Sequence, residues 1–501
     1  MNDETRPETS DDTGRRGGSP SRPSAGLVAG LLLGPALCLT LAALPSPGGL
    51  SREAWLTAGV AGWMAVWWLS QAVPLAVTAL LPVLLFPMLG IAEAVDAAHP
   101  YAHPLVFLFL GGFVIALTIE RWNLHRRVAV AIVSIAGVRP DRLIGGFMLA
   151  TAGLSMWVSN TATTLMMVPI GLSVVAFIEG RRDGGAPSTP EQNRFARGLL
   201  LAIAYAASIG GTATLIGTPP NAFLAGYLSQ NHGIELGFAR WMLLGVPLAA
   251  GLLLIAWLLL TRVLYRAEGL DLARIADGIA SERARLGPPE RGEALTALLF
   301  ASVALAWVFQ PLIERLVPVS DTAIALAGAV AAFVIPVDLK KRQFLMDWDH
   351  AIRLPWGILI LLGGGFSLAS AIQSTGLAAW LGSLVAGGGH LPLIVLLLTV
   401  TGLVVFLTEI TSNTATAAVF VPIAATLAVS LGFDALTFAV PVALAASCAF
   451  MMPVATPPNA IVFAAGRLDV IHMCTAGIAL NLIATAAIAL AALFLVPVVF
   501  G

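Results

Sequence analysis

The sequence predicts an all-α polytopic membrane protein with about 11 transmembrane helices and two re-entrant hairpins, arranged in two inverted-topology repeats. An apolar composition, a series of long apolar segments and a duplicated set of polar motifs predict this class. Hydrophobic residues make up 58% of the 501 residues and charged residues 11%, whereas a water-soluble domain carries about 25% charged residues. The mean hydropathy is +0.89. The chain is therefore expected to lie in a lipid bilayer.

The charge balance and the cysteines exclude several function classes. Lys and Arg number 27 against 28 Asp and Glu, for a formal charge of -1, which excludes a nucleic-acid binder that works by phosphate neutralisation. Cys38, Cys448 and Cys474 stand in apolar segments without CxxC spacing, so neither a disulfide framework nor a thiolate metal site is expected. The expected partners are membrane lipid and small solutes.

Four regions follow one another along the chain. Residues 1–25 are rich in Ser, Pro, Gly, Asp and Arg, and they predict a disordered tail and not a signal peptide, because no apolar core with a cleavage site follows. A first half covers 26–264 and a second half covers 294–501. Between them, the strongly charged segment 265–293 is predicted to be a linker.

Apolar segments of membrane-spanning length recur through both halves. Two stretches, 143–179 and 393–430, are interrupted by polar residues at their centres. The other spans are predicted at 26–44, 54–70, 73–90, 104–119, 199–228, 241–264, 294–312, 321–337, 356–373, 436–466 and 474–500. Of these, 199–228 and 436–466 each contain a helix break at TPPN.

The interrupted stretches belong to an internal repeat. The sequence SNTAT occurs at 159–163 and again at 412–416. The same spacing relates the GGF sequences that begin at Gly111 and Gly364, and the VP pairs that begin at Val168 and Val421. The sequence TPPN also occurs twice, at 218–221 and 456–459. The SNTAT, GGF and VP pairs share one spacing along the chain, which indicates a duplication.

Arginine distribution gives the two repeats opposite orientations. Nine arginines lie between 121 and 197, whereas 374–450 contains no Lys or Arg. Because cytoplasmic loops collect Lys and Arg, the loop 180–197 is predicted to be cytoplasmic and the loop near 387–392 extracellular. The linker and the N-terminus should also be cytoplasmic, and the C-terminus extracellular. Such inverted repeats are typical of secondary transporters.

The SNT and TPPN motifs predict helices that begin inside the membrane. Ser, Asn and Thr are N-cap residues, and an apolar run follows each SNT. Proline suits the first helical turn, so Thr218 and Thr456 should cap helices that start at Pro219 and Pro457. The four resulting helix N-termini favour an anion, while the Ser, Thr, Asn and carbonyl oxygens beside them suit sodium. A single such motif is more often a local bend, but its occurrence in both halves favours a binding site.

Several other residues have a structural and a functional interpretation. Ser155 and Thr408 stand four residues before each SNT and could face the same ion. Glu409 is an intramembrane carboxylate, and we favour a structural hydrogen-bonding role over a proton or cation site because its counterpart is Met156. Pro100 and Pro104 interrupt the helix that a metal pair of His99 and His103 would need, so these histidines are interpreted as part of an interfacial loop. The glycine runs 111–112, 363–365 and 387–389 are interpreted as packing and bend positions.

At these residues the chain resembles the divalent anion:sodium symporter family of INDY-type di- and tricarboxylate transporters. The resemblance covers nearly the whole chain beyond residue 50, including PLAVTALLP at 74–82, both SNT motifs and both TPPN motifs. It implies a homodimer of protomers with 11 transmembrane helices and two re-entrant hairpins. It also implies a scaffold part that holds the dimer and a transport part that moves like an elevator.

The resemblance also implies residue roles. Substrate carboxylates would contact Asn160, Thr161, Asn413 and Thr414, with Thr218 and Thr456 as further contacts. One sodium ion would bind among Ser155, Ser159, Asn160 and Gly217, and a second among Thr408, Ser412, Asn413, Ala455 and Pro457. Ser208, Thr212 and Thr214 are additional candidate ligands.

The function that fits best is import of a C4-dicarboxylate such as succinate, fumarate or malate across the plasma (inner) membrane, coupled to sodium as a symported ion. A sodium-independent dicarboxylate exchanger, a sulfate or citrate transporter and a channel remain alternatives. No HExxH, catalytic GxSxG context or GxxxxGK[ST] is present, so neither an enzyme nor an ATP-driven pump is expected. Neither 354–466 nor 143–180 contains Lys or Arg, so we expect bound cations to supply the positive charge for a dianion.

Overall fold

The computed structural model describes residues 25–179, 188–267, 270, 272–385 and 391–501. Nearly the whole predicted N-terminal tail, residues 180–187 of the loop 180–197 and the glycine run 387–389 lie outside the described residues. The described part is helical except for one short hairpin of two antiparallel strands.

The first half of the chain contains the helices α1 to α12 and a terminal π-helical turn. Their bounds are α1 Ala25–Ala43, α2 Arg52–Ser70, α3 Leu75–Thr78, α4 Leu81–Leu89, α5 Ala94–Ala98, η1 His99–Ala102, α6 Pro104–Arg121, α7 Leu124–Ala136, α8 Pro140–Ser155, α9 Asn160–Ile178, α10 Pro190–Gly211, α11 Pro219–His232, α12 Phe238–Leu258 and η3 Leu259–Leu264.

The remaining elements run from the charged linker to the C-terminus. Their bounds are α13 Leu272–Arg285, α14 Arg291–Val308, α15 Gln310–Ile313, α16 Asp321–Val334, β1 Pro336–Asp338, β2 Gln343–Phe344, α17 Trp348–Ala351, α18 Trp356–Ser374, α19 Leu377–Val385, α20 Leu393–Leu407, α21 Asn413–Ser430, α22 Leu436–Ala446, α23 Pro457–Ala464 and α24 Val470–Phe500.

The helices confirm the predicted class of all-α membrane protein. Among the described residues, seven helical segments are long and apolar enough to cross a membrane, and shorter apolar helices accompany them. The longest are α24 and the combined segment Ala94–Arg121 that ends with α6. The total number of crossings and the opposite orientation of the repeats stay predictions.

Local sequence signals explain where the interrupted helices begin. In α9, the side chain of Ser159 caps the helix by accepting a hydrogen bond from the Ala162 N–H (3.3 Å). Thr456 caps α23 in the same way, accepting from the Asn459 N–H (3.3 Å). Proline, which has no N–H group that would need an acceptor, occupies the first turn of both α11 and α23. All four helices begin at the predicted residues, but the side chains of Thr218 and Ser412 form no capping hydrogen bond.

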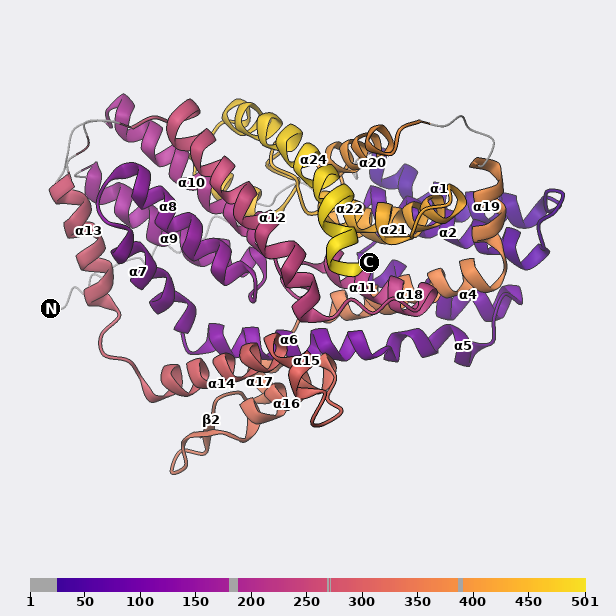
Figure 1. The fold of residues 1–501 in the computed structure, drawn as a ribbon, viewed down its shortest axis with the longest axis horizontal. Coiled ribbons are helices and arrows are strands. Elements are labelled where there is room, and N and C mark those ends of the chain that lie inside the picture. Colours follow the sequence, from indigo (N-terminus) through magenta and orange to yellow (C-terminus); the bar gives the residue numbers. More distant parts are fainter. Residues whose placement is uncertain (1–24, 180–187, 268–269, 271, 386–390) are drawn as a thin grey trace, which may run out of the picture.

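The two hairpins lie on different sides of the molecule. Figure 1 shows α8 and α9 at the left and α20 and α21 at the upper right, with α12 and α24 between them. Helix α10 packs against α8 and α9, whereas α24 packs against α20 and α22. The first packing needs a glycine, since a Cβ atom on Gly210 would lie 2.5 Å from the Ala152 carbonyl oxygen. A Cβ on Gly111 would similarly lie 2.6 Å from the Ala325 carbonyl carbon, so this glycine allows α6 and α16 to pack closely.

The linker between the halves is partly helical and packs on the first half. Helix α13 contacts α9 and α7, and its Glu282 is only 3% exposed. This carboxylate accepts hydrogen bonds from Arg126 (3.2 Å), Ser173 (2.8 Å) and Arg285 (2.8 Å). The amphipathic helix α7 was not predicted, and α10 begins at Pro190, earlier than the predicted start at residue 199.

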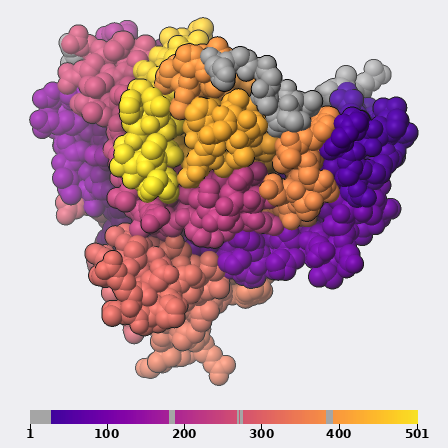
Figure 2. All heavy atoms as spheres, turned by 45° about the vertical axis from the view of Figure 1, so that its right-hand side comes forward, coloured from indigo at the N-terminus to yellow at the C-terminus, as the bar shows by residue number. Residues whose placement is uncertain are grey.

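The β1–β2 hairpin leads into a turn that is fixed to the end of α6. Figure 2 shows this region projecting from the lower side of the molecule. The Trp122 indole N–H donates to the Leu345 carbonyl (2.8 Å), and Arg121 pairs with Asp347 (2.6 Å). Burial opposes ionisation of Asp347, but hydrogen bonds from His350 and the charge of Arg121 outweigh it and hold the pKa of Asp347 below its ordinary value. These contacts position the chain that precedes α18.

Candidate functional site

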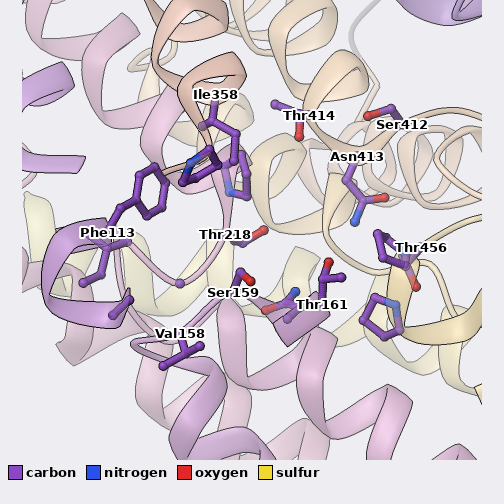
Figure 3. A pocket seen from close by; sticks show the side chains of 18 of the residues that line it. Phe113, Val158, Ser159, Thr161, Thr218, Ile358, Ser412, Asn413, Thr414 and Thr456 are labelled. Atoms are coloured by element: carbon purple, nitrogen blue, oxygen red, sulfur yellow. The ribbon is translucent and has the colours of Figure 1, made fainter. Parts of the chain in front are cut away.

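A cavity of about 700 Å³ lies where the four interrupted helices begin. Residues at the N-termini of α9, α11, α21 and α23 line it, together with side chains of α6 and α18. Figure 3 shows Ser159 and Thr161 on one side of this space, Ser412, Asn413 and Thr414 on another, and Phe113 and Ile358 on the wall formed by α6 and α18. The volume is in the range of small-molecule sites, about 300–1,000 Å³.

All six predicted substrate residues line this one cavity. They come from four helix starts that are far apart in the sequence, and they are Asn160, Thr161, Thr218, Asn413, Thr414 and Thr456. The hydroxyl of Thr218 also lies 3.4 Å from the hydroxyl of Ser447, so the first TPPN motif meets the chain after α22. Free N–H groups at helix starts and side-chain hydroxyls and amides together can bind an anion.

Oxygen atoms cluster beside the tip of the first hairpin. The Ser155 hydroxyl lies 2.6 Å from Asn160 Oδ1 and 2.7 Å from the Ala207 carbonyl oxygen. A Cβ on Gly217 would lie 3.0 Å from the Ser155 carbonyl oxygen and would overlap the Gly211 carbonyl oxygen. The set contains side-chain and backbone oxygens and no nitrogen ligand, which is the donor chemistry that sodium prefers. The Ala207 and Gly211 carbonyls were not predicted, because backbone ligands have no residue signature.

A corresponding cluster lies beside the second hairpin. The Thr408 hydroxyl lies 2.9 Å from Asn413 Oδ1 and 2.9 Å from the Ala446 carbonyl oxygen. The other predicted members, Ser412, Ala455 and Pro457, line the cavity next to it. This arrangement repeats the first cluster with Thr408 in place of Ser155, Asn413 in place of Asn160, and the Ala446 carbonyl in place of the Ala207 carbonyl.

The remaining candidate ligands have other contacts. The Thr214 hydroxyl donates to the Met156 carbonyl and accepts from the Gly217 N–H (3.1 Å), so it ties the hairpin tip to the loop before α11. The Thr212 hydroxyl donates to its own helix at the Ile209 carbonyl (2.7 Å). The Ser208 hydroxyl is buried and has no hydrogen-bond partner within the described residues.

Two buried asparagines brace the interrupted segments. Asn221 donates from Nδ2 to the carbonyls of Thr212 (3.1 Å) and Thr214 (2.8 Å). Asn459 donates in the same way to the carbonyls of Ala449 (3.3 Å) and Met452 (3.0 Å). The last residue of each TPPN motif therefore fixes the loop before its helix, a role that the motif alone does not reveal.

Glu409 holds the interrupted segment of the second half. One carboxylate oxygen accepts hydrogen bonds from the Phe450 N–H (2.7 Å), the Met451 N–H (2.9 Å) and Asn481 Nδ2 (2.7 Å). The other oxygen accepts from the Met452 N–H (2.9 Å). All four of these hydrogen bonds come from N–H groups of the chain, which agrees with the structural role favoured from the sequence.

The expectation of a cavity without Lys or Arg was wrong. Arg353, at the turn before α18, lines the cavity, as does Glu120 near the end of α6. Arg353 lies one residue before the Lys- and Arg-free segment, and only the fold brings it to the cavity.

Within the described part of the chain, no group of three or more His, Cys, Asp and Glu side chains could hold a metal ion. His99 lies in η1, and His103 caps α6 by accepting from the Leu105 N–H (3.3 Å). His103 therefore shapes the start of α6, whereas His99 begins a short 3-10 helix where the sequence predicts an interfacial loop.

An all-helical membrane fold with two pairs of interrupted helices around one polar cavity defines a membrane transporter of the secondary type. Residues 26–500 match the family described as the sodium:sulfate symporter transmembrane region. The chain belongs to this family, and the predicted resemblance is confirmed.

Curated relatives and solved structures agree with this class. The chain is 40% identical over 485 residues to the sodium-dependent dicarboxylate transporter SdcS of Staphylococcus saprophyticus, covering 95% of this chain and 93% of the relative. SdcS of Staphylococcus aureus strain USA300 is 40% identical over 486 residues, with the same coverage of both chains.

Two solved structures share the fold. The YdaH transporter of Alcanivorax borkumensis has a TM-score of 0.58 at 16% identity, and the match covers 94% of this chain and 97% of that one. Neisseria gonorrhoeae MtrF has a TM-score of 0.57 at 13% identity, with 94% and 95% coverage.

Proposed function

We propose that this chain is a secondary active transporter that imports C4-dicarboxylates, such as succinate, fumarate and malate, by sodium symport. The observation that carries the proposal is the single cavity into which four helix N-termini open, flanked by two oxygen clusters of corresponding composition. The 40% identity to relatives named sodium-dependent dicarboxylate transporters supports the choice of substrate and ion.

The residues divide into anion and cation contacts. Substrate carboxylates accept hydrogen bonds from Asn160, Thr161, Asn413 and Thr414, with Thr218 and Thr456 beside them. One sodium ion binds among Ser155, Ser159, Asn160 and Gly217, and a second among Thr408, Ser412, Asn413, Ala455 and Pro457. Each asparagine amide can offer its oxygen to sodium and its N–H groups to a carboxylate, and so links the two ligands.

Sodium supplies charge that the helix starts lack. Each helix N-terminus contributes only a partial charge, worth up to about 2 kcal/mol toward an anion in favourable geometry. Two bound cations would neutralise a dianion in a site of low dielectric. The anion and the cations therefore stabilise each other, which is the physical basis of coupled transport.

The remaining parts of the proposal concern assembly and movement. A homodimer in the plasma (inner) membrane, with a cytoplasmic N-terminus and an extracellular C-terminus, fits the arginine distribution and the family resemblance. In an elevator motion, the part with both hairpins would carry the site past a scaffold that includes α6 and α18.

Uptake by proteoliposomes tests the function. A sodium gradient should drive accumulation of labelled succinate, with a sigmoidal dependence on sodium if two ions bind. Equal uptake in choline and sodium buffers, stimulated by internal dicarboxylate, would reject symport and identify an exchanger. Competition by sulfate or citrate instead of succinate would reject the C4 assignment, and failure to accumulate substrate against its gradient would indicate a channel.

A further inference from the structure

The walls of the cavity differ in the kind of charge that they present to an anion. The helix starts of α9, α11, α21 and α23 contribute hydroxyls, amides and backbone groups without a formal charge. Among the described residues that line the cavity, only Glu120 and Arg353 are charged. Both belong to the wall built by α6 and the start of α18.

Arg353 is free to bind a ligand, unlike its cationic neighbours. Arg121, Arg126 and Arg127 form ion pairs with acidic side chains at 2.6 Å, 3.2 Å and 2.9 Å. Within the described part of the chain, the exposed Arg353 side chain has neither a hydrogen bond nor an ion pair. A guanidinium group offers a planar pair of donors that matches a carboxylate.

Glu120 carries a charge opposite to that of Arg353 and is also exposed. A second titratable side chain, His125, lines a smaller cavity together with Glu120. Burial lowers the pKa of His125, although the Ile119 carbonyl and Glu120 act in the opposite direction. His125 is therefore neutral at neutral pH, and Arg353 is the cationic side chain of this wall.

We propose that Arg353 is a specificity-determining residue that contacts a carboxylate of the dicarboxylate in this cavity, and that Glu120 opposes it by repelling the same anion. This inference rests on the proposed function. Arg353 precedes α18 and does not belong to either hairpin tip, so it favours a dianion over a monoanion without taking part in sodium binding. A four-carbon anion leaves room for water in a cavity of about 700 Å³, so screening limits the effect of either charge.

Paired substitutions in the purified full-length protein test the proposal. Succinate affinity at saturating sodium, measured by calorimetry, should fall roughly threefold in Arg353→Gln and rise by a similar factor in Glu120→Gln, as expected for one partly screened charge. Arg353→Lys should restore part of the loss. Lys341→Gln is the matched control, because Lys341 is an exposed cation on the β1–β2 hairpin and does not line the cavity.

Two further readouts separate electrostatics from a change of shape. Added choline chloride should weaken succinate binding in Glu120→Gln, where only attraction remains, and strengthen it in Arg353→Gln, where only repulsion remains. The loss in Arg353→Gln should also be larger for succinate than for monomethyl succinate, because Coulomb energy scales with the ligand's charge.

The outcomes distinguish this inference from the proposed function. If the wild-type protein binds succinate but both variants match it, or both shift in the same direction, the role of Arg353 is rejected and the proposed function stands. If the wild-type protein binds no dicarboxylate with sodium present, both proposals fail. Normal sodium-induced thermal stabilisation of each variant shows that its fold is intact.

Discussion

At the scale of single residues, the hydroxyls of Ser155 and Thr408 show why the clusters suit a cation. Each hydroxyl has one hydrogen, yet two acceptor oxygens lie within hydrogen-bond distance of it. With the asparagine amide in this orientation, one of these oxygens faces the hydroxyl without a hydrogen between them. A cation that takes lone pairs from both removes this repulsion.

Gly217→Ala should weaken sodium binding by about tenfold, because the new Cβ would displace carbonyl oxygens that must be held to about 0.5 Å. The Cβ would overlap the Gly211 carbonyl oxygen and lie 3.0 Å from that of Ser155. Thermal stabilisation by sodium measures the change. Gly153→Ala is the control, since a Cβ at this helical position meets nothing within 4 Å. Equal sodium responses in both variants would exclude Gly217 from the site.

Asn160→Ala and Asn413→Ala should each weaken sodium and succinate binding together, because in the proposed site each amide would contact both ligands and coupling between sites is reciprocal. A tenfold loss, about 1.4 kcal/mol, is the order expected for a lost hydrogen bond to a charged group. Titrations of each ligand at several fixed concentrations of the other measure both terms. Loss of one affinity with the other intact would show that the amide serves a single ligand.

Glu409→Gln should lower stability and leave the pH profile of uptake unchanged. The glutamine amide has only one oxygen, and its NH₂ group is a donor. This group would face an N–H that now donates to the carboxylate, such as that of Met452, and the hydrogen bond would be lost. The cost is about 1–3 kcal/mol for an unsatisfied buried group. The melting temperature and the uptake rate across pH measure the two effects. A variant that has lost its pH dependence would instead identify Glu409 as a proton site.

At the scale of elements, the sequence predicts where the interrupted helices start better than it predicts which other segments are helical. The starts of α9, α11, α21 and α23 follow from caps and prolines, which act within one turn. Helices α7 and α13 lie outside the predicted spans because amphipathic helices lack a long apolar run. Arg353 reaches the cavity through contacts of Leu345 and Asp347 with the end of α6, more than 200 residues away in sequence. Such tertiary contacts leave no local pattern.

Arg467→Ala should destabilise the contact between α9 and α23. Arg467 forms two hydrogen bonds, 2.7 Å and 2.8 Å, with Glu179 at the end of α9, and the Glu179 side chain is 0% exposed. Glu179 raises the pKa of Arg467, so the pair is ionised. Loss of one partner of a buried pair costs about 3–5 kcal/mol, less where one partner is partly exposed. The melting temperature should fall clearly.

The matched control for this pair is Arg194→Ala. Arg194 also pairs with a glutamate, Glu191, at 2.7 Å, but the two side chains are 47% and 41% exposed. An exposed pair within one helix contributes little. Equal melting temperatures for the two alanine variants would show that the Arg467 pair does not stabilise the fold.

At the scale of the whole molecule, the two halves use corresponding contacts. Ser155 and Thr408 each meet an asparagine oxygen and a helix-end carbonyl, and Asn221 and Asn459 each brace two carbonyls of a loop. Glu409 breaks the correspondence, because it anchors only the second loop. The duplication predicted that Ser155 corresponds to Thr408 and Asn160 to Asn413, whereas the carbonyl contacts, the bracing asparagines, the donors to Glu409 and the position of Arg353 required the fold.

Opposite orientation of the halves predicts which surfaces an impermeant reagent reaches. In a variant without native cysteines, Gly501→Cys should be labelled in intact cells, while Pro289→Cys, in the linker, should be labelled only after permeabilisation. Both positions are exposed, so access to each depends on the side of the membrane. Labelling of Pro289→Cys in intact cells would contradict the cytoplasmic linker.

The hydroxyls of Ser155 and Thr408, which each face two acceptor oxygens, should limit leakage of the dicarboxylate when no sodium is bound. In the proposed cycle, a carrier without sodium keeps repelling oxygens beside Asn160 and Asn413, so the amides are not held in the orientation that an anion needs. The dicarboxylate alone then finds no ordered site and does not cross. The unbonded oxygen pair in each cluster would thus prevent loss of dicarboxylate from the cell when sodium is scarce.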